Sequence, residues 1–91
     1  MDLATERSDR TMIELIMPRL DESMRTGKLI EWLRKEGERV EKGQPIVLVE
    51  GEKATFEIEA PASGILRKML HSAGSEVGVD EPIAVIEADA A

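Results

Sequence analysis

The chain has 91 residues, which is enough for one small domain. It contains no cysteine, and this excludes disulfide bonds and thiolate metal sites. Its formal net charge of -7 argues against nucleic-acid binding, which needs a basic surface. The only aromatic residues are Trp32 and Phe56, so the core must be aliphatic, and a domain this small has no room for a deep catalytic cleft.

Residues 1–10 mix acidic and basic side chains and contain no apolar stretch. They match neither a secretory signal nor an acid-poor transit peptide, so we interpret them as a disordered leader and expect a cytoplasmic protein of bacterial type. No apolar run approaches the length of a membrane span, and we expect no membrane association. The folded domain is predicted at 11–88, followed by 89–91 as a tail or the start of a linker.

Hydrophobic periodicity predicts a series of short strands. Apolar residues alternate with polar or small ones in 13–17 and 56–60, which is the period of a half-buried strand. Two apolar runs rich in β-branched residues, 46–49 and 83–86, each follow a proline. Proline is tolerated at the first position of a strand, so these runs are predicted strands as well.

Residues 29–36 are harder to assign, because their apolar side chains fit one face of a helix as well as a strand. We favour a strand, since Gly27 and Gly37 bracket the segment too closely for a typical helix. The glycine-containing segments 36–43 and 73–80 predict hairpin turns.

An internal repeat organises the chain. Residues 27–50 and 64–87 align at an offset of 37 without a gap, and eight of 24 positions are identical. The identical pairs are Gly27/Gly64, Leu29/Leu66, Leu33/Leu70, Gly37/Gly74, Val40/Val77, Pro45/Pro82, Ile46/Ile83 and Glu50/Glu87. The segments before the two copies also correspond, except that the first has a longer loop, 19–26, where the second has only Ala62 and Ser63.

The repeat predicts an all-β fold. Each copy gives about four short strands and cannot bury its apolar face alone, whereas two copies related by a pseudo-twofold axis can close a flattened sandwich around one core. The connection 51–54 then corresponds to the region of the chain termini. We therefore expect the hairpin that carries Lys53 at one end of the sandwich and the termini at the opposite end.

The residues around this hairpin resemble a known attachment site. Glu50-Gly51-Glu52-Lys53-Ala54 resembles the Glu-Thr-Asp-Lys-Ala motif of the lipoyl domain in the acyltransferase component of 2-oxo acid dehydrogenase complexes. Two flanking stretches are also similar to that family, Met17-Pro18-Arg19-Leu20-Asp21-Glu22-Ser23-Met24 and Glu59-Ala60-Pro61-Ala62-Ser63-Gly64. The resemblance covers roughly residues 12–87. It implies a barrel-sandwich hybrid of two four-stranded antiparallel sheets.

The resemblance implies a carrier without an active site of its own. Lys53 would carry lipoate as a covalent amide, and the residues by which partner enzymes recognise the hairpin would be Glu50, Gly51, Glu52, Ala54, Gly37 and Gly64. The partners would be a thiamine-dependent 2-oxo acid decarboxylase, an acyltransferase core, a dihydrolipoamide dehydrogenase and the lipoylation enzymes. The isolated domain is expected to be monomeric, and the Met17-Pro18 start favours a complex of the pyruvate or acetoin type.

The chain departs from the family at two positions beside the lysine. Gly51 replaces the usual Thr and should loosen the turn, because glycine has more backbone freedom. Glu52 replaces the usual Asp, keeping the charge but moving it by one methylene. In the family this acidic residue helps the partner dehydrogenase to recognise the domain, so these departures bear on partner choice.

Three other carrier or adaptor functions are compatible with such a fold. A biotinyl carrier usually has Met on both sides of its lysine, whereas Glu52 and Ala54 stand here. A glycine-cleavage carrier is longer and has added helices, and unmodified modules of this fold serve as structural adaptors. His71, the only histidine, lacks a Ser/Asp partner pattern and is interpreted as structural, while Trp32 and the methionines are interpreted as core.

Overall fold

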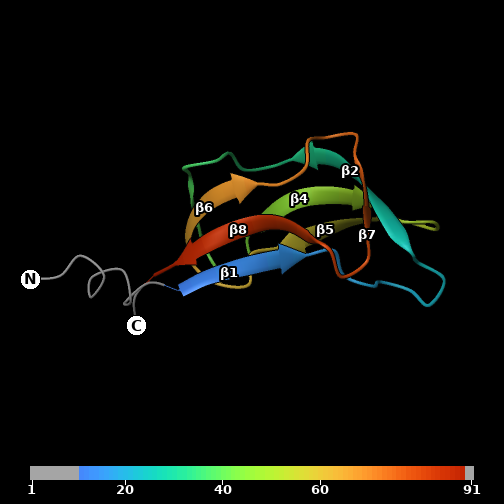
Figure 1. Cartoon of the computed structure of the whole chain (residues 1–91), viewed down its shortest axis with the longest axis horizontal. Coiled ribbons are helices and arrows are strands. Elements are labelled where there is room, and N and C mark those ends of the chain that lie inside the picture. Colours follow the sequence, from blue (N-terminus) through green and yellow to red (C-terminus); the bar gives the residue numbers. More distant parts are fainter. Residues whose placement is uncertain (1–10, 90–91) are drawn as a thin grey trace, which may run out of the picture.

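The computed structural model describes residues 11–89, which form eight β-strands in two four-stranded antiparallel sheets (Figure 1). The strands are β1 (Thr11–Ile16), β2 (Thr26–Trp32), β3 (Arg39–Val40), β4 (Pro45–Glu50), β5 (Thr55–Glu59), β6 (Gly64–Met69), β7 (Glu76–Gly78) and β8 (Pro82–Ala88). The predicted all-β sandwich is therefore confirmed. Within the described residues, no helix is long and apolar enough to cross a membrane.

Each sheet combines strands from both copies of the repeat. The strand orders are β1-β8-β6-β3 and β5-β4-β2-β7. The two orders correspond strand by strand: β1 and β3 of the first sheet take the places of β5 and β7 in the second, and β8 and β6 take the places of β4 and β2. This is the predicted pseudo-twofold relation. In each sheet the two central strands come from one copy and the two outer strands from the other, and neither copy can form its sheet alone.

The core is aliphatic, as the composition predicts. The buried hydrophobic side chains are Leu15, Met17, Met24, Leu29, Val40, Ile46, Val47, Val49, Ile58, Ala60, Leu66, Val77, Ile83, Ala84 and Ile86. Trp32 is half-buried against this cluster and donates its indole N–H to the backbone carbonyl of His71 at 3.0 Å. Because two sheets supply alternate side chains to one layer, the core holds both sheets in a fixed relation.

The β4–β5 hairpin lies at one end of the sandwich, and the start of β1 and the end of β8 lie at the opposite end (Figure 1). Thr11 and Gly64 both pair with Ala88 at one end, whereas the β4–β5 connection lies at the other. At the terminal end the Arg39 guanidinium binds both carboxylate oxygens of Asp89, at 3.1 and 2.7 Å. These hydrogen bonds hold the pKa of Asp89 below its ordinary value and fasten the end of β8 to β3.

Three local predictions needed correction. The choice of a strand over a helix for 29–36 is confirmed for residues 29–32, but the strand ends at Trp32, because the backbone turns toward β3 after Leu33 donates to the carbonyl of Ile46. The predicted hairpin turns 36–43 and 73–80 each contain a short strand, β3 and β7, that pairs with the other copy of the repeat. Met12, expected in the core, is 56% exposed on the outer strand β1. The predicted leader, 1–10, lies outside the described residues.

At Gly64 the backbone of β6 lies very close to the backbone of its neighbour β8, and a substitution tests this close approach. A Cβ at this position would collide with the carbonyl oxygen of Glu87 and lie 2.8 Å from the Cα of Ala88. Because these neighbours are backbone atoms, Gly64→Ala should lower the free energy of unfolding by about 1–3 kcal/mol in a urea titration. Gly78→Ala is the control, since its Cβ meets only the movable carboxylate of Glu81 and should change stability by less than about 0.5 kcal/mol. Equal stability of the two variants would contradict the close approach.

Candidate functional site

Lys53 lies at the centre of a four-residue turn between β4 and β5. The strands remain paired up to Glu50 and Thr55, and the Gly51 N–H donates to the carbonyl of Ala54 at 2.8 Å, which closes the turn. Glu52 and Lys53 occupy its two central positions, and both side chains are exposed. The turn therefore presents an amine to solvent on a short and well-defined projection of the sheet.

The side chains of Met24 and Phe56 pack against this turn. A Cβ placed on Gly51 would lie 3.1 Å from Cε2 of Phe56 and 3.8 Å from the sulfur of Met24. Met24 is fully buried and Phe56 is half-buried. Gly51 thus lets the ring of Phe56 approach the turn closely, and this packing offsets the backbone freedom that glycine brings. That Gly51 loosens the turn stays a prediction.

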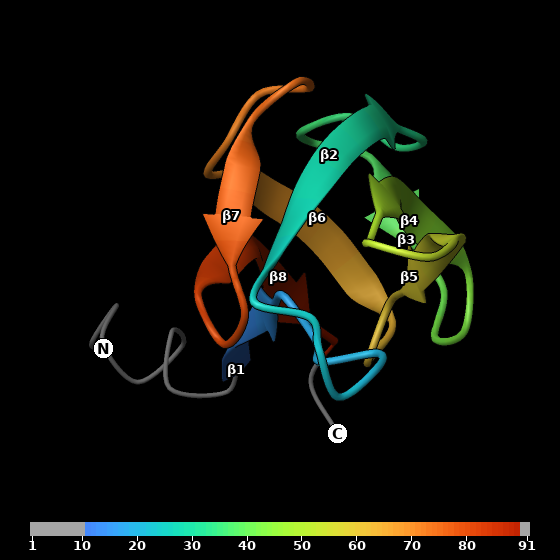
Figure 2. The same cartoon turned by 90° about the vertical axis from the view of Figure 1, so that its right-hand side faces the viewer.

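The longer loop of the first repeat copy lies at the same end of the molecule as the hairpin (Figure 2). Asp21 organises it: one carboxylate oxygen accepts hydrogen bonds from the Ser23 N–H at 2.9 Å and the Ser23 hydroxyl at 2.8 Å. Arg19 donates to the carbonyl of Met24 at 2.8 Å. The pKa of Asp21 is lowered, first by the hydrogen bond from the Ser23 hydroxyl and further by the positive charge of Lys53. The loop is therefore held mainly by its own hydrogen bonds.

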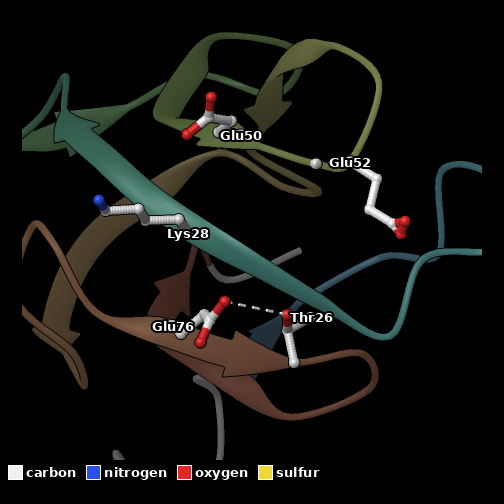
Figure 3. A pocket seen from close by; sticks show the side chains of 6 residues that line it. Thr26, Lys28, Glu50, Glu52 and Glu76 are labelled. Carbon is white, nitrogen blue, oxygen red and sulfur yellow. Dashed lines mark hydrogen bonds between the residues drawn. The ribbon is translucent and has the colours of Figure 1, made fainter.

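A shallow hollow of about 160 Å³ lies beside the hairpin on the outer face of β2 and β7 (Figure 3). Its lining residues are Thr26, Lys28, Glu50, Gly51, Glu52 and Glu76. Lys28 lies on β2 directly opposite both Glu50 and Glu76, while the Thr26 hydroxyl donates to Glu76 at 3.5 Å. Lys53 is not among the lining residues, so its side chain is presented apart from this acidic hollow.

The exposed lysine in a closed turn is suited to carrying a covalently attached group. Among residues 11–89, no group of three or more His, Cys, Asp or Glu side chains could hold a metal ion. Glu57 and Glu59 lie exposed on the outer strand β5, as a solvated strand face requires. An exposed lysine amine can be acylated by an activated acyl donor once its ammonium form has lost a proton.

The structure brings together most of the predicted recognition residues but not all. Glu50, Gly51, Glu52 and Ala54 surround Lys53 in the hairpin. Gly37 lies in the β2–β3 turn with a φ of 89° and donates to Leu66, and Gly64 is buried opposite Ala88 at the terminal end. The geometry gives these two glycines a turn role and a packing role, respectively; a recognition role for them stays a prediction.

A protein-family model described as "Biotin-requiring enzyme" matches residues 13–86, which include most of both sheets and the whole hairpin. The chain belongs to this biotin/lipoyl family. A biotin/lipoyl domain is an attachment module whose cargo is covalently bound, in keeping with the exposed turn. The family alone does not separate lipoate from biotin as the cargo.

Relatives of this biotin/lipoyl domain include a pyruvate dehydrogenase E1 component subunit beta from Rhizobium meliloti (strain 1021), 44% identical over 85% of the chain and 17% of the relative. A second is the dihydrolipoyllysine-residue acetyltransferase component of the pyruvate dehydrogenase complex from Rickettsia prowazekii (strain Madrid E), 43% identical over 81% of the chain and 18% of the relative. The chain thus spans less than a fifth of the length of either relative.

A solved structure matches the domain over nearly its whole length. It is the lipoyl domain of the 2-oxoglutarate dehydrogenase complex from Azotobacter vinelandii, with a TM-score of 0.70, 26% sequence identity, and coverage of 87% of this chain and 99% of that one. This match, together with the acetyltransferase relative, confirms the resemblance to lipoyl domains drawn from the sequence. It also confirms the barrel-sandwich fold.

Sequence reasoning missed the contacts between the hairpin and the loop that precedes β2. Neither Asp21 nor Met24 was singled out as a site residue, because nothing in the local sequence places them beside residues 51–54. One signal was available: the loop 19–26 is where the two repeat copies differ most in length. A departure from internal symmetry at the functional end of a symmetric fold is a reason to inspect that segment.

Met24 provides a direct test of how the hairpin is supported. Met24→Ala should lower the free energy of unfolding by about 2–4 kcal/mol, because it leaves a cavity beneath the turn. It should also speed hydrogen exchange at the Gly51 amide, which closes the turn. Met12→Ala is the matched control, since Met12 is 56% exposed and its loss should cost less than about 0.5 kcal/mol. The free energy of unfolding is measured by urea titration and the exchange rate of the Gly51 amide by NMR. Equal values for Met24→Ala and Met12→Ala would contradict the support of the turn by Met24.

Proposed function

We propose that this domain is a lipoyl carrier in which Lys53 holds lipoate as an amide on its Nζ. The observation that carries the proposal is the position of Lys53 at the centre of a closed, exposed turn, at the end of the sandwich opposite Thr11 and Ala88. A carrier attached to a larger assembly through its termini would present this lysine outward. The similarity to a dihydrolipoyllysine-residue acetyltransferase and to a lipoyl domain supports lipoate as the cargo.

The domain contributes position rather than bond-making groups. The Lys53 amine attacks the acyl carbon of an activated lipoyl donor, the donor's leaving group departs with the bonding electrons, and the nitrogen loses a proton as the amide forms. Once attached, the dithiolane supplies redox and acyl-transfer chemistry. Tethering to a rigid domain raises the effective concentration of the cargo at each enzyme that it visits.

The names of the relatives support a role in 2-oxo acid dehydrogenase complexes, with pyruvate as the proposed substrate type. The partners that we propose are a thiamine-dependent decarboxylase that acylates the arm, an acyltransferase core that unloads it, and a dihydrolipoamide dehydrogenase that reoxidises it. A lipoylation enzyme would recognise the residues around the lysine, which are Glu50, Gly51, Glu52 and Ala54. The carboxylates of Glu50 and Glu52 give the hairpin an acidic surface that fits basic docking sites.

Intact-mass spectrometry tests the attachment. Protein produced with both lipoate and biotin available, and with a competent lipoate ligase, should gain one lipoyl group. Lys53→Arg should abolish the gain, because the guanidinium is not acylated, whereas Lys28→Arg should retain it, since Lys28 lies in a strand facing the hollow. A biotinyl increment would assign the domain to the biotin carriers instead. An unmodified wild-type protein would favour a structural adaptor.

A further inference from the structure

The chain that leaves β2 lies against the end of β6 and the residues that follow it (Figure 1). The Trp32 indole donates to the His71 carbonyl at 3.0 Å, and the Gly37 N–H donates to the Leu66 carbonyl at 2.7 Å. The two stretches therefore run side by side in opposite directions, one from each copy of the repeat. Together they form a surface that includes neither the lysine turn nor the end of β8.

Two corresponding leucines of the repeat lie partly exposed on this surface. Leu33 and Leu70 are an identical pair, and their N–H groups donate in the same way to the carbonyls of Ile46 and Ile83. Leu33 is half-buried and Leu70 is 41% exposed. Because the backbone at both positions is fixed by hydrogen bonds, the leucines offer apolar area that a partner can cover without distorting the domain.

Arg34, the residue after Leu33, is a cation without an acceptor. Its Nε is shielded from solvent and has no hydrogen-bond partner, and no carboxylate within residues 11–89 forms an ion pair with it. An N–H that is removed from water without an acceptor costs free energy, and native folds contain few of them. Only Nε of the three guanidinium nitrogens is shielded in this way, so the two Nη groups remain open to solvent.

The two carboxylates that follow Arg34 in the chain are bound to backbone donors instead. Glu36 accepts the Met69 N–H at 2.8 Å, and Glu38 accepts the Lys35 N–H at 2.8 Å. The chain has 19 acidic residues and a net charge of -7, so carboxylates are not scarce. The fold nevertheless directs these two away from Arg34, and its counter-charge is left to come from outside the domain.

We propose that Leu33, Arg34 and Leu70 form a docking surface, the axial surface, for an acidic segment of a partner protein. A carboxylate of that segment accepts hydrogen bonds from both Nη groups of Arg34, the bidentate pairing that a guanidinium favours. An apolar side chain next to the carboxylate covers the two leucines. Because the shielded Nε reflects a packed aliphatic stem, the guanidinium is held in a restricted orientation and little side-chain entropy is lost on docking.

The axial surface lies away from the lysine turn. Along β2, Lys28 is paired with Glu50 at the hairpin end, whereas Trp32 is paired with Val47, in the first half of β4. A partner on the axial surface thus leaves Lys53 uncovered, so that the domain can be held by one protein while the turn meets another. This inference goes beyond the proposed function and does not depend on what Lys53 carries.

An NMR titration of the unmodified domain tests the axial surface with two synthetic peptides, acetyl-Leu-Glu-Leu-Glu-amide and acetyl-Leu-Gln-Leu-Gln-amide. The Glu peptide should bind in the millimolar range and shift the methyl signals of Leu33 and Leu70 and the Nε–H signal of Arg34. The Gln peptide has the same apolar side chains but no charged ones. It should bind about tenfold more weakly, as expected when a charge-assisted bidentate pair is lost.

Three variants separate the charged part of the surface from its apolar part. Arg34→Gln should weaken binding of the Glu peptide about tenfold, to the level of the Gln peptide. Lys35→Gln is the matched control, since it removes an exposed positive charge from the same loop and should change the affinity less than about twofold. Leu70→Ser should weaken both peptides by the same factor, and unchanged backbone signals in β6 show that each variant is folded.

Several results would overturn the proposal. Equal binding of the two peptides, equal affinities of wild type and Arg34→Gln, or an absence of shifts at Leu33 and Leu70 would reject docking of an acidic segment. Inorganic phosphate that shifts the Arg34 signal as strongly as the Glu peptide would indicate a plain anion site. Shifts that depend on protein concentration alone would assign the surface to a second copy of this chain. None of these results depends on lipoylation, so failure of the proposed cargo is detected separately by intact mass.

Discussion

The structure depends on the exchange of outer strands between the two halves of the repeat. Each half supplies the central pair of one sheet and the outer pair of the other, so that β3 pairs with β6 and β7 pairs with β2. Since neither half can bury its apolar face without the other, folding of the two sheets must be one cooperative event. The position of Lys53 follows from this, because the connection between the halves emerges where the central strand β4 meets the outer strand β5.

The attachment site that we propose lies where the pseudo-symmetry is broken. The terminal end has a short turn at residues 61–63 and is closed by Arg39 and Asp89, whereas the hairpin end has the longer loop 19–26. That loop contributes the buried Met24 beneath the turn and the half-satisfied carboxylate of Asp21 beside it. The additional residues on one side thus distinguish the hairpin end, where we propose that the cargo is attached, from the end that holds Thr11 and Asp89.

Much of the fold could be predicted from the sequence, because the repeat fixed the symmetry and the period-two alternation fixed the faces of the strands. The strand pairing could not, because β3 and β7 are two and three residues long and derive their structure from partners in the other half. Residues 50–54 were recognised because they are contiguous, whereas Asp21 lies near them only through packing. Met12 was misassigned to the core because composition does not distinguish an outer strand face from an inner one.

The central claim is that Lys53 is the attachment point and that lipoate is its cargo. The most direct measurement is tandem mass spectrometry of a peptide containing residues 50–54, prepared from protein isolated from its own cells. The account predicts fragment ions that place a lipoyl group on Lys53. A biotinyl group at that position, a lipoyl group on another lysine, or an unmodified Lys53 in cells whose other lipoyl proteins are fully modified would contradict it.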